Sequence, residues 1–166
     1  MAHQKLIFSM PARADLAFDA FHYHHWRGQW DSLVSHTQVQ HGAPCPSVGA
    51  ISENTGAGTL RALSMRTQFV SYHRPTLAAA KMIGRSFPLT QWAASMRHQP
   101  DGPDRSLLIY TYTFDVARHA CAGSWSLLYA GYSNARPGSA LHGWPSFWRS
   151  MPQRLPHGSA SNPFRP

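Results

Sequence analysis

The sequence predicts an α+β fold in which two short helices accompany a curved antiparallel sheet of about seven strands. Three observations support this prediction. Apolar residues recur at helical spacing only near the N-terminus, whereas from residue 48 onward they alternate every second residue. Turn-forming sequences separate the alternating stretches at short intervals, which favours hairpin connections. A short apolar stretch before the helices, residues 6–8, supplies a further strand.

The helices are expected between residues 12 and 33. Pro11 ends the first strand, and residues 12–22 then place their apolar side chains at the spacing of one helix face. A second short helix is expected over residues 25–33, and Gly28 predicts a break between or within the two helices. Residues 35–40 are expected to be extended.

The strands that follow are read from period-two alternation and from turn residues. The expected strands are residues 48–53, 63–72, 77–85, 87–98 and 107–116. Residues 54–58, Asn-Thr-Gly-Ala-Gly, are predicted to close the first of these strands as a hairpin loop. The strongest turn signal is Gln-Pro-Asp-Gly-Pro-Asp at residues 99–104. Strands joined in this way predict an antiparallel sheet.

The acidic residues divide the chain into two parts. All seven lie at or before Asp115, and residues 118–166 contain none. That second part is rich in Pro, Gly and Ser, has five arginines and shows no steady period. We therefore predict a folded domain over residues 1–117 and an irregular or disordered basic tail over residues 118–166.

Composition narrows the class of function. The net charge of +8 divides into +3 for the domain and +5 for the tail, and the domain charges are scattered singly, which argues against nucleic-acid binding. The longest apolar runs are too short for a membrane span, and no signal-peptide pattern begins the sequence. Two cysteines without a CxxC partner predict no disulfide framework. A cytoplasmic protein is expected.

Several stretches resemble the START-like superfamily, the polyketide cyclase/dehydrase group also called SRPBCC, over about residues 4–117. The matching stretches are Asp19-Ala20-Phe21-His22 with Trp26, Trp30-Asp31-Ser32-Leu33-Val34, residues 42–50, 63–67, 69–72, 92–96 and 109–114. The resemblance implies the helix-grip fold, in which a strand, two helices and six strands are followed by a long C-terminal helix. It further implies a cavity for a hydrophobic molecule between sheet and helix.

The tail departs from the family pattern because it lacks a long amphipathic helix. Its interior prolines and glycines each oppose a helix, by about 3 and 1 kcal/mol respectively. One hypothesis is that the tail is read in a shifted frame, since moving residues 139–152 by one base permits a helix-like apolar run. The alternative is a natural, disordered basic tail. Two short helices alone cannot cover a sheet of seven strands.

Candidate ligand-binding residues are apolar or amphipathic side chains that share a face of their strand, together with one tryptophan from the second helix. They are Trp30, Met65, Thr67, Phe69, Trp92, Met96, Tyr110, Tyr112 and Phe114. In a plain sandwich these residues would be core, whereas the family resemblance implies that they line a cavity. Hydroxyls such as those of Thr67 and Tyr112 would then orient the ligand.

Acid/base candidates are fewer. Asp31, next to Trp30, could have a raised pKa in an apolar cleft, although a helix cap or surface charge is the plainer interpretation. His36 and Tyr112 are the other candidates. The histidines at 22, 24, 25 and 36 form a cluster without a cysteine or carboxylate at ligand spacing, so no metal and no cofactor are predicted.

The function predicted from the sequence is binding of a lipid-like or polyketide-like molecule. The first alternative is a polyketide cyclase- or dehydratase-type enzyme. A further alternative is an impaired product of a frameshifted gene, whose sheet face would be exposed and would favour self-association.

Overall fold

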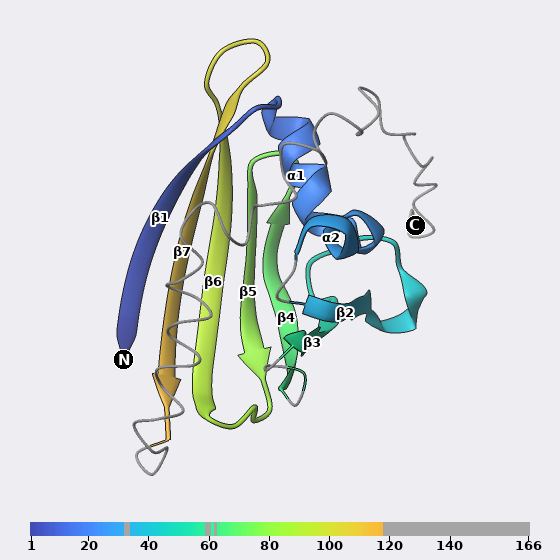
Figure 1. The fold of residues 1–166 in the computed structure, drawn as a ribbon, viewed down its shortest axis with the longest axis vertical. Helices are drawn as coiled ribbons and strands as arrows, with labels where there is room; N and C mark the ends of the chain where they lie inside the picture. The colour runs from blue at the N-terminus through green and yellow to red at the C-terminus, as the bar shows by residue number, and fades with distance from the viewer. Residues whose placement is uncertain (32–33, 59–60, 62, 118–166) are drawn as a thin grey trace, which may run out of the picture.

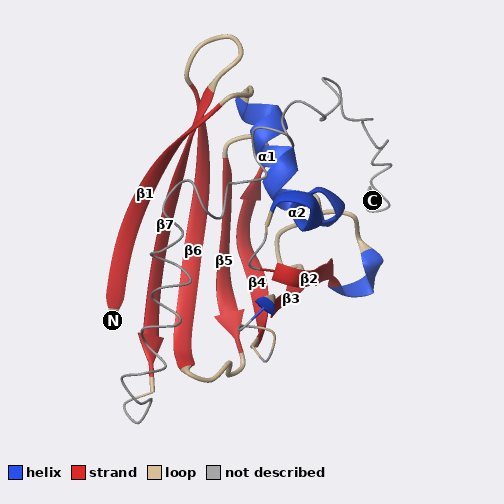
Figure 2. Ribbon diagram, viewed as in Figure 1, coloured by secondary structure: helices blue, strands red, loops and turns tan. Residues whose placement is uncertain are grey.

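A computed structural model describes residues 1–31, 34–58, 61 and 63–117 (Figure 1). It has the predicted α+β class, with helices and strands placed as in Figure 2. Its elements, in chain order, are β1 (Ala2–Met10), α1 (Ala14–His22), α2 (His24–Trp30), β2 (Val34–Val39), the 3-10 turn η1 (Gln40–Gly42), β3 (Ile51–Gly56), β4 (Ser64–His73), β5 (Leu77–Ile83), β6 (Leu89–Pro100) and β7 (Ser106–Val116). The predictions about residues 118–166, including the missing helix and the shifted frame, lie outside the described residues.

The strands form one curved antiparallel sheet in the order β1-β7-β6-β5-β4-β3-β2. From β2 to β7 each strand pairs with the next along the chain, as the hairpin pattern predicts. The first strand instead pairs with the last, so β1 and β7 lie side by side at one edge of the sheet (Figure 1). The prediction of a sheet of about seven antiparallel strands is confirmed.

The helix α1 packs its apolar stripe against the sheet. Ala14, Ala17, Phe18 and Phe21 are buried and follow the spacing of one helix face. Ala17 and Phe21 form a core cluster with Met10 at the end of β1 and with Leu108 of β7. The burial of this stripe, rather than helix propensity, holds α1 on the sheet.

The break between the helices lies at a different residue from the one predicted. Tyr23 has extended backbone angles and both ends α1 and begins α2. Gly28 was expected to cause the break, but α2 continues through it. A glycine costs a helix only about 1 kcal/mol, and Trp30, two residues later, packs against Phe21 with ring centroids 4.5 Å apart.

Several strands extend beyond their predicted bounds, β1 and β3 by the largest margins. Residues 54–56 were expected in a hairpin loop but belong to β3, because Asn54 pairs with Thr37 of β2 on one side and with Met65 of β4 on the other. β1 begins at Ala2 rather than at residue 6, since its whole length pairs with β7. In both cases, pairing with neighbouring strands overrides a weak local pattern.

An ion pair between a buried carboxylate and an exposed guanidinium joins α1 to the turn between β4 and β5. Nε and Nη2 of Arg74 donate to the two carboxylate oxygens of Asp19, each at 2.7 Å. The Asp19 side chain is only 4% exposed, so this bidentate contact is the means by which its charge is tolerated inside the domain. It fixes the position of α1 along the sheet.

Candidate functional site

The predicted ligand-binding residues of β6 and β7 lie on one face of the sheet. The register pairs them directly across the two strands: Trp92 with Phe114, Ala94 with Tyr112, and Met96 with Tyr110. Residues directly opposite each other in an antiparallel pair point to the same side. We call this side the inner face, because α1 and α2 pack against it (Figure 2).

The inner face continues across the neighbouring strands. Ala80 of β5 stands between Ala94 of β6 and Phe69 of β4. Thr67 and Met65 follow Phe69 along the same side of β4. All eight strand residues predicted to bind a ligand therefore share one face of the sheet. The sequence pattern grouped them by strand face but did not show which face of each strand points inward. Their role in ligand binding stays a prediction.

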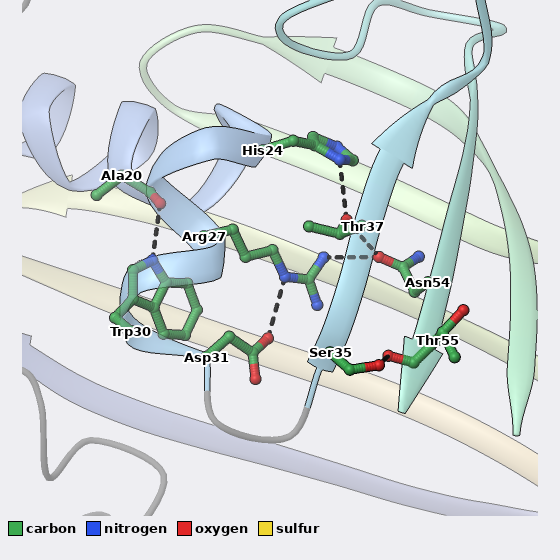
Figure 3. A network of polar contacts seen from close by, with 9 residues as sticks. All are labelled: Ala20, His24, Arg27, Trp30, Asp31, Ser35, Thr37, Asn54 and Thr55. Atoms are coloured by element: carbon green, nitrogen blue, oxygen red, sulfur yellow. Dashed lines mark hydrogen bonds and ion pairs between the residues drawn. The ribbon is translucent and has the colours of Figure 1, made fainter. Parts of the chain in front are cut away.

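Trp30, the ninth predicted residue, reaches the same region from α2. Its indole Nε1 donates to the carbonyl oxygen of Ala20 at 2.9 Å, which ties the end of α2 to α1 (Figure 3). Trp30 and Met96 both pack against the core cluster formed by α1, β1 and β7. The structure thus brings the helix residue and the strand residues to one part of the domain.

Small side chains occupy the middle of the inner face. Ala78 and Ala80 of β5 lie beside Met96 and Ala94 of β6 in the register. The larger Tyr112 stands beyond Ala94. Because a methyl group projects less far from the sheet than an aromatic ring, the inner face is shallower over these alanines than over the larger side chains on the neighbouring strands. We call Ala78, Ala80 and Ala94 the alanine floor.

Two histidines are buried where α1 crosses the sheet. His98 of β6 lies on the inner face and is 1% exposed, with its ring centroid 5.3 Å from that of Phe18 and 5.7 Å from that of Phe21. His22 of α1 stacks on Phe18 at 4.2 Å and lies 5.9 Å from His98. Burial lowers the pKa of His98 to about 4. Burial, opposed by a hydrogen bond to Phe18, lowers that of His22 to about 3. Both rings are therefore neutral at pH 7.

The two histidines differ in how their ring nitrogens are satisfied. Nδ1 of His22 lies 2.7 Å from the carbonyl oxygen of Phe18. Because a carbonyl can only accept, Nδ1 carries the proton. Neither ring nitrogen of His98 has a hydrogen-bond partner among the described residues, and the same holds for the hydroxyl of Ser52 on β3. Leaving a buried polar group without a partner costs about 1–3 kcal/mol.

A polar network joins α2 to the edge of the sheet (Figure 3). The hydroxyl of Thr37 donates to Oδ1 of Asn54 at 2.8 Å. Because a hydroxyl has one proton, it must accept in its other contact, and Nδ1 of His24 donates to it at 2.8 Å. Arg27 donates to the same Asn54 oxygen at 3.3 Å and, through Nε, to Oδ2 of Asp31 at 3.0 Å. Burial, with a smaller effect of Arg27, lowers the pKa of His24 to about 4. The network holds α2 on β2 and β3.

Solved structures identify the fold. A START superfamily protein from Mycobacterium smegmatis shares 15% identity with a TM-score of 0.66, covering 85% of this chain and 94% of that one. The chain has a START-like fold. Norcoclaurine synthase from Thalictrum flavum, solved with dopamine and hydroxybenzaldehyde, shares 12% identity with a TM-score of 0.60, covering 91% of this chain and 88% of that one.

A third similar structure is the di-domain ARO/CYC protein BexL from the BE-7585A biosynthetic pathway. It shares 7% identity with a TM-score of 0.66, and the match covers 91% of this chain and 48% of the longer protein. No family model and no curated protein matches the amino-acid sequence. The START-like resemblance read from the sequence is thus confirmed for the fold, and the likeness extends to the fold alone.

The three acid/base candidates do not come together in the START-like fold. Asp31 caps the C-terminal end of α2 and is paired with Arg27. His36 is exposed and points to the opposite side of β2 from Thr37, away from the inner face. Tyr112 lies on the inner face, where its hydroxyl donates to Oε1 of Gln4 on β1. Only Tyr112 therefore shares a face with the predicted ligand-binding residues.

The predicted histidine cluster also separates. His22 is buried under α1, His24 contacts Thr37, His25 stacks on Trp26 with ring centroids 4.2 Å apart, and His36 is on the far side of the sheet. Within the described ranges, no group of three or more His, Cys, Asp or Glu side chains could hold a metal ion. None of the helices in the same ranges is long and apolar enough to cross a membrane.

Sequence reasoning missed His98, and a signal for it was present. The alternation Trp92, Ala94, Met96 on β6 reaches His98 at its next inward position. A histidine in that register, next to two apolar neighbours, predicts a buried imidazole. Ser52 had no such signal, because its place opposite Thr67 depends on the register between β3 and β4.

Proposed function

We propose that this domain binds a hydrophobic or aromatic small molecule on the inner face of the sheet. The observation that carries the proposal is the alanine floor, flanked by the aromatic side chains of Tyr112 and Phe69. A flat ring or acyl chain lying on Ala80 and Ala94 would gain contact with the floor below and with the aromatic rings beside it. Apolar sites with a few polar groups are the usual form of small-molecule sites.

The comparisons support the same proposal. Structures of similar fold include norcoclaurine synthase with two aromatic molecules bound and an ARO/CYC protein of a biosynthetic pathway. The cyclase- or dehydratase-type alternative has less support from this chain. Of its three proposed acid/base residues, Asp31 is already engaged by Arg27 and His36 faces away from the site. Binding without turnover is therefore the function we propose.

The test is a titration of the full 166-residue chain with N-phenyl-1-naphthylamine, an uncharged dye that fluoresces in apolar surroundings. We expect saturable binding of one dye per chain. Ala94→Leu raises the alanine floor and should weaken binding roughly tenfold or more, because the added methylene groups take the place of ligand. Ala93→Leu makes the same change at the next residue, on the other face of β6, and is the matched control.

The outcomes separate clearly. Weakening by Ala94→Leu with wild-type binding in Ala93→Leu supports a site on the inner face. Equal binding by both variants would place the dye elsewhere and refute the proposal, as would a signal that never saturates. Cooperative thermal melting of both variants, followed by circular dichroism, excludes unfolding as the cause.

A further inference from the structure

The charged residues of the sheet all point away from the inner face. Six of the seven strands contain one charged residue each (Asp, Glu, Lys or Arg), and β2 contains none. These six residues are Lys5, Glu53, Arg66, Lys81, Arg97 and Asp115. The register places Lys5 opposite Thr111 and Arg97 opposite Ile109, on the side opposite to Tyr110 and Tyr112. The pairing of β5, β4 and β3 places Lys81, Arg66 and Glu53 on that same outer side.

Within the part of the chain that the structure describes, the two arginines that bind α1 and α2 beside the inner face are already paired. Arg74 is held by both carboxylate oxygens of Asp19. Arg27 donates to Asp31 and to Asn54. A carboxylate or phosphate placed on the inner face would therefore find both of these guanidinium groups engaged. An ion without a partner in such surroundings is strongly disfavoured.

Among the described residues, His98 and Ser52 are the buried inner-face residues whose side-chain polar atoms lack a hydrogen-bond partner, and His98 is the one beneath α1, beside Phe18 and Phe21. It lies one inward position beyond Met96, and so about 7 Å from it along β6. Across β5, Met96 is opposite Ala78, so His98 borders the alanine floor. Its imidazole is neutral, with one N–H donor and one lone-pair acceptor. A hydroxyl group is the smallest ligand group that can either donate to the lone pair or accept from the N–H.

We propose that the site selects an uncharged aromatic molecule whose hydroxyl group hydrogen-bonds to the imidazole of His98, and that it rejects carboxylates. This inference rests on the proposed function, since it names the chemistry of the ligand for the same inner face. The ring lies on the alanine floor and the hydroxyl reaches the end covered by α1. Tyr72 adds no charge there, because burial raises the pKa of its hydroxyl well above the ordinary value.

Competition for bound N-phenyl-1-naphthylamine tests the inference with three probes of one shape. At pH 7, 2-naphthol is uncharged and has a hydroxyl, naphthalene has no polar group, and 2-naphthoate is an anion. We expect 2-naphthol to displace the dye at a concentration roughly tenfold lower than naphthalene, because it satisfies a buried polar group. We expect 2-naphthoate to require a concentration at least roughly a hundredfold higher than 2-naphthol.

Failure of the inference and failure of the proposed function give different results. If the dye does not bind, the proposed function fails. If the dye binds and 2-naphthoate competes as well as 2-naphthol, the site exists but the selectivity is wrong. In His98→Phe the ratio of the 2-naphthol and naphthalene affinities should fall to about one. His73→Phe removes an exposed histidine on the outer face and should keep the wild-type ratio. A preference for 2-naphthol that survives His98→Phe would overturn the assignment of His98.

A second measurement needs no variant. In the full chain with ¹⁵N-labelled histidine, the ring nitrogens of His98 can be observed in long-range ¹H–¹⁵N spectra. Addition of 2-naphthol should move a ring-nitrogen resonance of His98, and an equal occupancy of naphthalene should leave it in place. Movement of His22 resonances alone, or equal movement with both probes, would refute the hydrogen bond to His98. This result decides the matter even if His98→Phe does not fold.

Discussion

Lowering the pH from 7.5 to 5 should destabilise the domain by several kcal/mol, because His22, His24 and His98 are held in neutral form. His22 and His98 are 4% and 1% exposed, and His24 is partly buried. Burial is the main cause that lowers the pKa of His22 to about 3 and those of His24 and His98 to about 4. In the unfolded chain all three rings face water and have the ordinary histidine pKa of about 6.5. Between these values the unfolded state binds more protons than the folded state, so stability falls as the pH falls.

The magnitude follows from the proton balance. At pH 5, about 1.5 units below the unfolded pKa, each histidine contributes a loss of about 2 kcal/mol relative to pH 7.5, or about 6 kcal/mol for the three. The folded pKa values hardly enter, because all three lie about one unit or more below pH 5. A hydrogen bond with Arg13 lowers the pKa of Asp15, which is ionised in both states across this window and contributes little. A domain with a total stability of about 5–15 kcal/mol would lose a large share of it.

Urea unfolding of the full chain at pH 7.5 and pH 5, followed by circular dichroism, measures this loss. In His98→Phe the difference in unfolding free energy between the two pH values should shrink by about 2 kcal/mol, since one of the three proton sites is gone. His73→Phe removes an exposed imidazole and should keep the wild-type difference. If His98→Phe also keeps the wild-type difference, His98 accepts a proton as readily in the folded domain as in the unfolded chain, and the reasoning is wrong.

Three further predictions concern the packing around the site and use the same unfolding measurement at pH 7.5. Arg74→Ala should cost about 1–3 kcal/mol, because it leaves the buried Asp19 carboxylate without its exposed partner; a loss well below about 1 kcal/mol would mean that water replaces the guanidinium. Phe18→Ala should cost about 3–5 kcal/mol, since this fully buried ring contacts both histidines; Leu16→Ala, on a half-buried position of the same helix, should cost clearly less. Thr37→Val should cost about 1–2 kcal/mol by removing the hydroxyl between α2 and β3, and no loss would show that the network does not hold α2.

Most of the sheet was predictable because its strands alternate in a simple way. On β6 the inward residues Trp92, Ala94 and Met96 are apolar and the outward ones are polar or small, and on β7 the inward residues Tyr110, Tyr112 and Phe114 are aromatic, so period two identified both strands and the residues that share a face. Where the alternation is weak, local reasoning failed. Asn54, Thr55 and Gly56 are turn-forming residues by type, yet β2 and β4 on either side hold them in a strand.

The candidate site was predictable in part for the same reason. Register between strands decides which residues meet across the sheet, and a single sequence does not contain it. Alternation alone therefore grouped Trp92 with Met96, but it could not show that Ala80 lies between Ala94 and Phe69. The separation of the histidines likewise depends on tertiary structure, since His24 and His36 are placed by different elements on different sides of the sheet.

The presence of His98 is harder to explain by folding alone than by ligand binding. A leucine or phenylalanine at this position would pack against Phe18 and Phe21, whereas the two ring nitrogens of His98 find no hydrogen-bond partner among the described residues. The imidazole therefore lowers the stability of the free domain at neutral pH and lowers it further in acid. Residues that break a packing rule in this way are expected at functional sites, where the loss is recovered when the partner binds. On this argument the acid sensitivity of the fold and the preference for a hydroxyl-bearing ligand have one cause, a neutral histidine at the end of an uncharged face.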